Sequence, residues 1–148
     1  MIENHCIYPL FVPLQYPEDT AISRQVMALM KNPSYIISRE LSVPEMFSVI
    51  SGAELVVGMW LHSLIYATTL GLPAMALVYD PKNSAFMDSI NQPDWVNVET
   101  MTTDEAASAF SRIMAELDQR KEQLQQTNKV LKETAEKNAL YAIELLNK

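Results

Sequence analysis

Residue types that can do chemistry gather at two short points of this sequence of 148 residues. Residues 58–62 read Gly-Met-Trp-Leu-His, and residues 79–82 read Tyr-Asp-Pro-Lys. His62 can donate or accept a proton, and Lys82 can pair with an anion. Gly58 has no side chain, so a ligand can approach its backbone closely. We therefore expect any functional site to involve these two segments.

The segments that precede these residues are apolar and have the length of buried strands. Strands are expected near residues 7–14, 34–38, 54–59, 73–79 and 95–98. Apolar side chains at helical spacing predict helices between them, over residues 18–31, 43–51, 61–70 and 84–90. Strict alternation of strands and helices favours parallel pairing with helices on both faces of the sheet. The sequence therefore predicts an α/β fold, doubly wound around a mostly parallel five-stranded sheet.

The ends of these strands define where a ligand would bind, because open parallel sheets hold ligands beyond the carboxyl ends of their strands. Gln15 and Asp19 follow the first expected strand, and Arg39 follows the second. Residues 58–62 follow the third strand, and residues 79–82 follow the fourth. We expect the following side chains to surround one cleft: Gln15, Gly58, Trp60, His62, Tyr79 and Lys82.

His62 falls in the first turn of its expected helix, where free backbone N–H groups favour an anion. The alternative interpretation is a histidine satisfied by nearby backbone groups. Gly71 is expected to end the same helix at the position after the C-cap, and Ser42 to cap the helix over residues 43–51.

Composition excludes several classes of function. The net charge is −7, and residues 1–101 carry ten acidic but only four basic residues, which disfavours binding to nucleic acid. With three glycines, the chain has neither a phosphate-binding loop nor a dinucleotide-binding fingerprint. His5 and His62 are too few for a zinc site, so we expect no metal and no cofactor. The single cysteine, Cys6, is expected to be a small buried apolar residue, and its isolation fits a reducing, cytoplasmic location.

Residues 55–79 carry no formal charge over 25 positions and would pass a hydropathy test for a membrane span. Gly71 and Pro73 would break a spanning helix, and His62 lies within it. A buried strand, a helix and a second buried strand explain the same residues, so we expect no membrane span.

From Thr102 onward the pattern is helical almost to the end of the chain. Leu117, Leu124 and Leu131 recur every seven residues, which is too short a series to establish a coiled coil. We expect one long helical segment that packs on its own sheet and breaks once, near residues 132–137, where the apolar stripe weakens. The chain would then divide into an α/β domain over residues 1–101 and C-terminal helices over residues 102–148.

Three motifs together resemble the signature of polysaccharide pyruvyl transferases: Gly58–Ile65, Gly71–Pro73 and Tyr79–Lys82. Pro13-Leu14-Gln15 with Asp19 is also similar to that family. The resemblance implies the carboxyl-terminal half of a two-domain enzyme that is glycosyltransferase-B-like, with an amino-terminal partner domain or a homo-oligomer. It implies transfer of a pyruvyl ketal group from phosphoenolpyruvate to a sugar of a cell-wall or exopolysaccharide precursor. The resemblance also implies that the family's central first strand is missing here. Removing that strand from the order 3-2-1-4-5-6 leaves, after renumbering, the strand order 2-1-3-4-5.

The resemblance also implies roles for individual residues. His62 would be the catalytic proton donor or acceptor, Lys82 the anion partner, and Gly58 a source of backbone N–H groups. The remaining substrate-binding candidates are Gln15, Asp19, Trp60, Leu61, Tyr79 and Asp80. Gln15, Asp19 and Asp80 fit equally well as simple turn or cap residues.

Trp60 departs from the family pattern, which has arginine at this position. An indole has no charge and cannot make the bidentate contact of arginine with phosphate or carboxylate. Lys82 or Arg39 could compensate, or Trp60 could stack on a nucleotide or sugar. Two alternatives therefore stay open: a nucleotide-sugar-binding, glycosyltransferase-like domain, and a non-catalytic interaction domain of flavodoxin-like order.

Overall fold

The computed structural model describes residues 7–146. His5 and Cys6, discussed above, lie outside the described residues. The strands are β1 (Leu10–Phe11), β2 (Tyr35–Ile36), β3 (Val56–Gly58), β4 (Ala74–Val78) and β5 (Trp95–Asn97). The helices are α2 (Glu18–Leu29), α3 (Val43–Ser51), α4 (Leu61–Thr69), α5 (Pro81–Ser89), α6 (Thr103–Ala115) and α7 (Leu117–Leu146).

The strands form two parallel sheets, so the single five-stranded sheet in the order 2-1-3-4-5 is a wrong prediction. β1 pairs with β2, and β4 lies between β3 and β5. Parallel pairing and the alternation of strands with helices are confirmed. The first two strands are too short to extend the sheet, because β1 and β2 are each only two residues long. Pro9 and Pro13, on either side of β1, have no N–H group to donate to a neighbouring strand.

The chain divides into two compact units, residues 1–52 and 53–148. The first unit holds β1, α2, β2 and α3. No residue of α2 is buried, and Ile22 and Leu29 are 61% and 86% exposed. The apolar periodicity of residues 18–31 thus correctly predicts a helix. The apolar side chains of this helix do not, however, pack into a core within the described structure.

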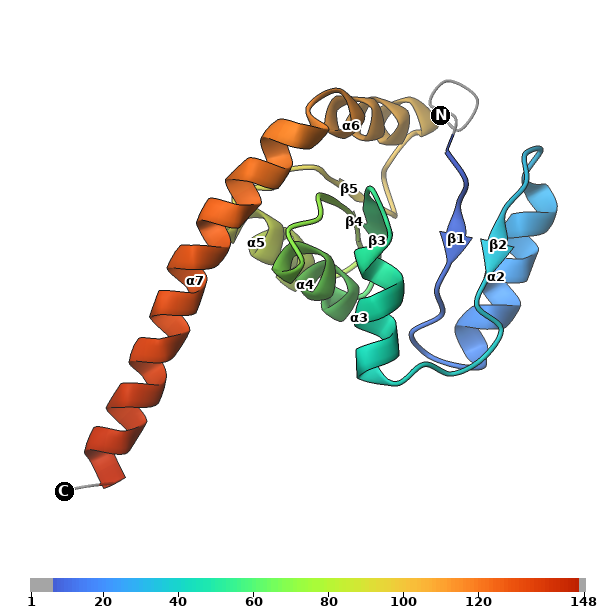
Figure 1. Ribbon diagram of the computed structural model, residues 1–148. Helices are drawn as coiled ribbons and strands as arrows, with labels where there is room; N and C mark the ends of the chain where they lie inside the picture. The colour runs from blue at the N-terminus through green and yellow to red at the C-terminus, as the bar shows by residue number, and fades with distance from the viewer. Residues whose placement is uncertain (1–6, 147–148) are drawn as a thin grey trace. The chain divides into compact units, whose positions relative to one another are not determined.

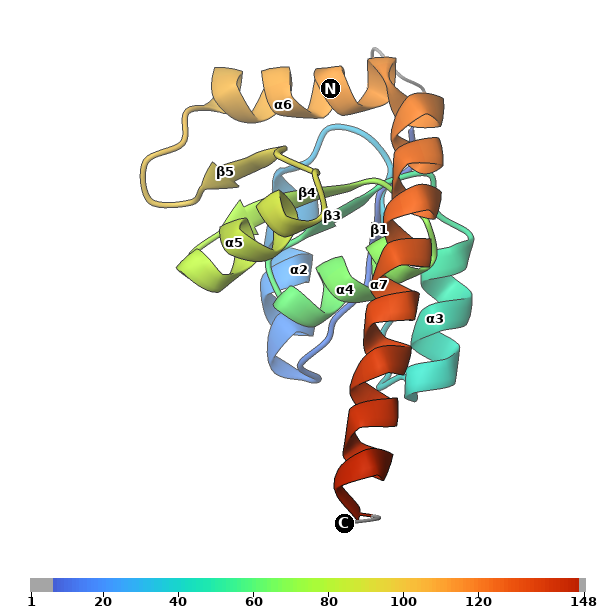
Figure 2. The ribbon, with the colours of Figure 1, turned by 90° about the vertical axis from the view of Figure 1, so that its left-hand side faces the viewer.

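The second unit is a three-layer arrangement around β3, β4 and β5 (Figure 1). α4 and α5 cover one face of this sheet, and α6 crosses the other (Figure 2). On the α6 side, Met75, Val96, Ala109 and Ile113 form a buried apolar cluster. β4 is almost wholly buried, which explains why its sequence reads as a continuous apolar run.

Gly71 ends α4 as expected from the sequence. It adopts a φ of 75°, in the left-handed region that favours glycine. Its N–H donates to the carbonyl of Thr68 at 3.0 Å, and the N–H of Leu72 donates to that of Ala67 at 2.9 Å. This is the Schellman pattern, and it turns the chain directly into β4.

The C-terminal segment breaks at Glu116, so the expected break near residues 132–137 is wrong. Glu116 leaves helical geometry with φ −113° and ψ 18°, and α7 then runs without interruption from Leu117 to Leu146. Residues 132–137 lack a strong apolar stripe but contain neither proline nor glycine, so nothing in their backbone ends a helix. Over the described residues, none of the helices is long and apolar enough to cross a membrane.

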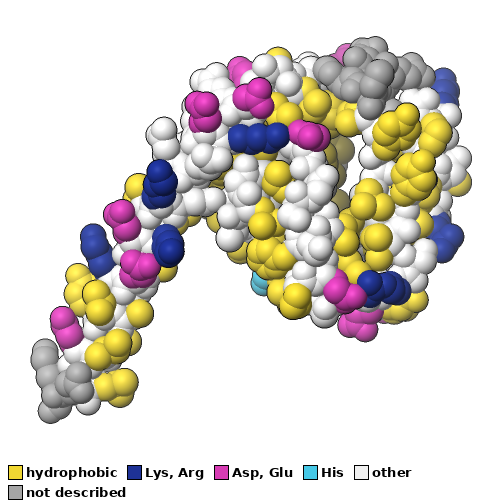
Figure 3. All heavy atoms as spheres, viewed as in Figure 1, with side chains coloured by type: hydrophobic (Ala, Val, Ile, Leu, Met, Phe, Trp, Pro, Cys, Tyr) yellow, Lys and Arg dark blue, Asp and Glu magenta, His cyan; other side chains and the backbone are white. Residues whose placement is uncertain are grey.

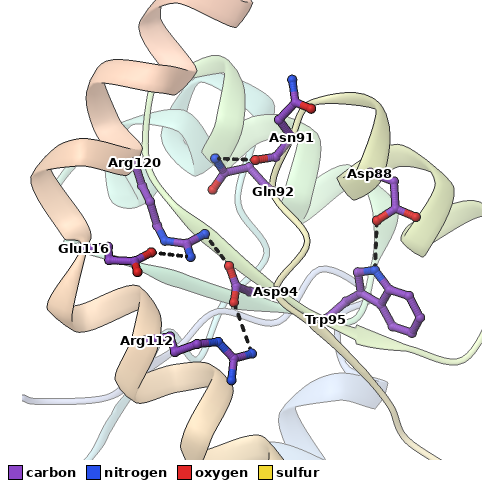
Figure 4. A network of polar contacts seen from close by, with 8 residues as sticks. All are labelled: Asp88, Asn91, Gln92, Asp94, Trp95, Arg112, Glu116 and Arg120. Atoms are coloured by element: carbon purple, nitrogen blue, oxygen red, sulfur yellow. Dashed lines mark hydrogen bonds and ion pairs between the residues drawn. The ribbon is translucent and has the colours of Figure 1, made fainter.

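A buried ion pair connects the β5 side of the sheet to the start of α7 (Figure 4). Asp94 is 2% exposed and accepts a hydrogen bond from Arg120, which is 8% exposed. Arg120 also donates to Glu116 at 2.8 Å, at the break between α6 and α7. Arg112 of α6 reaches the other oxygen of Asp94 at 3.5 Å. One buried carboxylate therefore fixes both C-terminal helices.

Asp94→Asn is expected to lower the free energy of unfolding by about 1.5–3 kcal/mol, because Arg120 loses its buried anionic partner and keeps only its pair with the more exposed Glu116. Glu54→Gln is the matched control, since it breaks the exposed Glu54–Lys121 pair (3.0 Å) and should cost no more than about 1 kcal/mol. Urea unfolding followed by circular dichroism measures both. Equal losses for the two variants would contradict the role given to Asp94.

Glu45, at the start of α3, has its own pH signature. The hydrogen bond from Arg39 lowers the pKa of Glu45 to about 2, and bonds from the Ser42 backbone and hydroxyl add to this. Because the folded pKa lies below the ordinary value of 4.5, the contribution is present above pH 4.5 and lost as pH falls toward 2.

In a carboxyl NMR titration, Glu45 should therefore titrate near pH 2. Arg39→Gln should move the midpoint upward, whereas Arg24→Gln should leave it in place, because Arg24 bonds to Ser38 instead. A normal midpoint in the parent chain would refute the Arg39 contact.

Candidate functional site

The carboxyl ends of β3 and β4 bring the two candidate segments to one edge of the second unit. The strands pair in parallel, with Gly58 opposite Ala76. β3 therefore leads into Met59 and Trp60, and β4 leads into Tyr79 and Asp80, at the same edge. Trp60 and Tyr79, which are 19 positions apart in the sequence, become neighbours through this register.

Trp60, Tyr79 and Lys82 form a cluster at this edge. The Trp60 and Tyr79 rings meet edge to face, with centroids 6.5 Å apart and planes at 75°. The Lys82 ammonium lies 5.9 Å from the centre of the Tyr79 ring, within the range of a cation–π contact. Trp60 is 39% exposed and Tyr79 is 45% exposed, so both rings keep surface available to a ligand.

Asp80 caps α5 and also pairs with Lys82. Its Oδ1 accepts a hydrogen bond from the Lys82 backbone N–H at 2.9 Å, and its Oδ2 lies 3.2 Å from the Lys82 ammonium. The backbone bond, followed by the side-chain contact, lowers the pKa of Asp80. Asp80 thus has the cap role that the sequence left open, and an anion approaching Lys82 meets a cation already partly neutralised.

Asn83 joins the two segments and was missed by sequence reasoning. It is fully buried, and its Nδ2 donates to the Met59 carbonyl at 2.7 Å. This bond fixes the loop between β3 and α4 against the first turn of α5. The sequence shows an amide side chain three residues after the Asp80 cap. Nothing in the sequence indicates that this side chain is buried.

His62 lies in the first turn of α4, as expected, and is exposed. Its ring is 6.3 Å from that of Tyr66, one turn further along the helix. Leu61 precedes it and is partly buried. The Ser63 hydroxyl donates to the Trp60 carbonyl at 2.6 Å, which fixes the entry into the helix.

Gly58 has a structural role that the sequence interpretation did not foresee. A Cβ at this position would collide with the Ser63 hydroxyl and lie 3.1 Å from a Leu64 methyl group. The close packing of β3 against α4 therefore favours glycine here, independently of any ligand.

Gln15 and Asp19 belong to the first unit, and their mutual contacts define a loop before α2. Asp19 Oδ2 accepts hydrogen bonds from the backbone N–H groups of Leu14 and Gln15, at 3.1 and 2.9 Å. Arg39 is paired with Glu45 at 2.8 Å. The expectation that Gln15 shares a cleft with His62 and Lys82 stays a prediction.

Within residues 7–146, no group of three or more histidine, cysteine, aspartate or glutamate side chains is placed to hold a metal ion. This edge presents the paired Lys82 cation and the exposed rings of Trp60 and Tyr79, and the exposed His62 lies in the first turn of α4.

Comparison with known proteins assigns a family to this arrangement. The family model described as polysaccharide pyruvyl transferase matches residues 2–81, just over half of the chain. This chain therefore belongs to the polysaccharide pyruvyl transferase family, as its motifs had indicated. The match includes Gly58–His62 and ends within the second segment, one residue before Lys82. Neither the curated proteins nor the solved structures contain a match to this sequence.

The packing at Gly58 gives a direct test of how this edge is built. Gly58→Ala is expected to lower the free energy of unfolding by about 1–3 kcal/mol, because the added methyl overpacks β3 against α4. At Gly52 the nearest atom to an added Cβ is 3.6 Å away, an ordinary contact. Gly52→Ala should leave the stability unchanged or raise it by up to about 1 kcal/mol. Chemical denaturation of both variants checks this, and a neutral Gly58→Ala would contradict the packing described.

Proposed function

We propose that this chain is the donor-side domain of a transferase that moves a pyruvyl group from phosphoenolpyruvate to a sugar of a cell-wall or exopolysaccharide precursor. The observation that supports this most directly is the meeting of the Gly58–His62 and Tyr79–Lys82 segments at one sheet edge, within a chain of this family. The facing side of the cleft would come from a second α/β domain, as in glycosyltransferase-B-like enzymes.

The proposed reaction uses two sugar hydroxyl groups and one phosphoenolpyruvate. One hydroxyl oxygen attacks the carbon that bears the phosphate, and a proton is added to the methylene carbon, which becomes a methyl group. The second hydroxyl oxygen displaces the phosphate and closes the ketal. Of the two hydroxyl protons, one balances the new methyl group, and the other leaves with inorganic phosphate.

His62 is the proposed proton carrier, because it is the exposed ionisable ring beside Trp60 at the start of α4. The first-turn N–H groups of α4 would favour an anion nearby. Lys82 would pair with the phosphate or carboxylate after exchanging part of its contact with Asp80. Tyr79 and Leu61 would shape the site.

Trp60 gives the sharpest test, since it replaces the arginine of the family motif. A bidentate charge-assisted pair contributes roughly 1.5–3 kcal/mol, so its absence weakens anion binding by about tenfold to a hundredfold. Trp60→Arg should therefore strengthen phosphoenolpyruvate binding in calorimetry by a factor in that range. The affinity should also fall more steeply with salt than in the parent chain. His62→Ala in the Trp60→Arg background should weaken binding again.

A second candidate function has one observation in its favour. Trp60 presents an indole that is 39% exposed and in T-shaped contact with Tyr79, and its exposed surface suits stacking on a flat base or sugar ring. If Trp60→Arg leaves phosphoenolpyruvate affinity unchanged while Trp60→Ala abolishes binding of a nucleotide-sugar, the donor assignment is wrong and stacking replaces it. If neither ligand binds any variant, a non-catalytic interaction domain becomes the better description.

A further inference from the structure

The C-terminal half of α7 carries an apolar surface that nothing in the described structure covers. Every residue from 129 to 146 is exposed, and this segment extends past the layers of the second unit (Figure 1). Leu131, Ile143, Leu145 and Leu146 are 46%, 54%, 70% and 86% exposed. Figure 3 shows hydrophobic side chains gathered along this end of the helix.

Part of this surface continues a stripe that is already packed at the start of α7. Its members recur at alternating spacings of four and three residues: Leu124, Asn128, Leu131, Ala135, Asn138, Ala142 and Leu145. Leu124 is fully buried, and Asn128 donates to the Thr68 carbonyl of α4 at 2.7 Å. Four–three spacing is the seam of a two-helix coiled coil. The same face thus packs on α4 as far as Asn128 and then continues into solvent.

The second unit cannot cover this part of the stripe itself. α7 is continuous to Leu146, with no break at which residues 129–146 could fold back. In proteins most of a helix's stability comes from the packing of an apolar face. The segment is about 27 Å long at 1.5 Å per residue, and the second unit leaves this length open to a partner helix.

Charge and sequence symmetry favour a second copy of this chain as that partner. Residues 129–146 hold three lysines and three glutamates, so two copies meet without net repulsion, although the whole chain carries −7. The neutral segment gives no attraction for nucleic acid or an anionic membrane. Leu131 and Leu145 each lie seven residues from Asn138, on either side of it. A two-fold axis at Asn138 therefore pairs Leu131 of each copy with Leu145 of the other, the reciprocal contact of an isologous interface.

We propose that residues 129–146 pair with the same segment of a second copy as an antiparallel two-helix seam, with the two-fold axis near Asn138. Leu131 of one helix then lies near Leu145 of the other, and the alanines allow the backbones to approach closely. The antiparallel direction places the two acidic α/β bodies at opposite ends of the seam. A parallel pair would bring those like-charged bodies side by side.

Sedimentation equilibrium of the full chain tests the pairing. The apparent mass should rise with concentration from 16.7 kDa toward twice that value. Leu145→Lys places a charge in the seam and should weaken dimerisation at least about tenfold. Leu140→Lys is the matched control: Leu140 is 58% exposed but lies nine residues from Leu131, on the opposite side of the helix. It should change the dimer affinity less than about threefold.

Circular dichroism of both variants is the control that checks whether they stay folded. A monomeric parent chain at hundreds of micromolar would overturn the proposal, and so would equal effects of the two substitutions. The proposal would also be overturned if the amides of residues 129–146 became protected from hydrogen exchange only after a different protein was added. The partner would then be that protein and not a second copy of this chain.

Cysteine cross-linking tests the direction, in a Cys6→Ser background with an added chemical oxidant. Asn138→Cys should give a disulfide-linked dimer. Leu131→Cys alone should not, because antiparallel partners place those positions about 21 Å apart, whereas a disulfide needs Cα atoms within about 7 Å. A mixture of Leu131→Cys and Leu145→Cys chains should cross-link. Efficient cross-linking of Leu131→Cys with itself would overturn the antiparallel arrangement.

Discussion

A carboxylate taken out of water is costly unless a cation and hydrogen bonds replace its hydration, and Asp94 meets that requirement through Arg120. The partner comes from α7, and Arg120 also bonds to Glu116, at the residue where α6 ends. The buried charge can therefore be accommodated only when α6 and α7 lie in one arrangement against β5. That arrangement fixes the direction in which α7 leaves the sheet. It thereby sets which face of α7 packs on α4, and which part of that face continues beyond it uncovered.

On the other side of the same sheet, neutral contacts rather than buried charges build the functional edge. Gly58 lets α4 pack tightly on β3, and Asn83 ties the loop at Met59 to the start of α5. These two contacts hold the Trp60 and Tyr79 rings in their edge-to-face geometry. The charges at this edge are exposed and already paired, as the contact of Lys82 with Asp80 shows. The framework is therefore rigid where it is buried, while its charged groups can exchange partners without unfolding anything.

The features that sequence reasoning found are those that local chemistry determines. Strand β4 follows from its apolar run, and the end of α4 follows from Gly71, whose left-handed conformation few other residues adopt. The features that it missed depend on residues far apart in the chain. Nothing near Asp94 indicates a partner 26 residues away, and that partner, Arg120, also bonds to Glu116, where α6 ends. The pairing of β1 with β2 in a separate sheet likewise depends on residues far apart in the chain. The periodicity of a strand indicates which of its faces is buried, but not which strand pairs with it.

Trp60 places an indole where the family motif has arginine. Arginine at the start of α4 would add a delocalised cation to an edge where Lys82 is already shared with Asp80. The indole contributes apolar area and a π face instead, in an edge-to-face contact with the Tyr79 ring. Affinity at this position then depends on stacking and desolvation, which salt hardly weakens, rather than on charge pairing, which salt screens. In the proposed reaction, anion binding would accordingly rest on the backbone N–H groups at the start of α4 and on Lys82. Neither of these groups comes from the side chain at position 60.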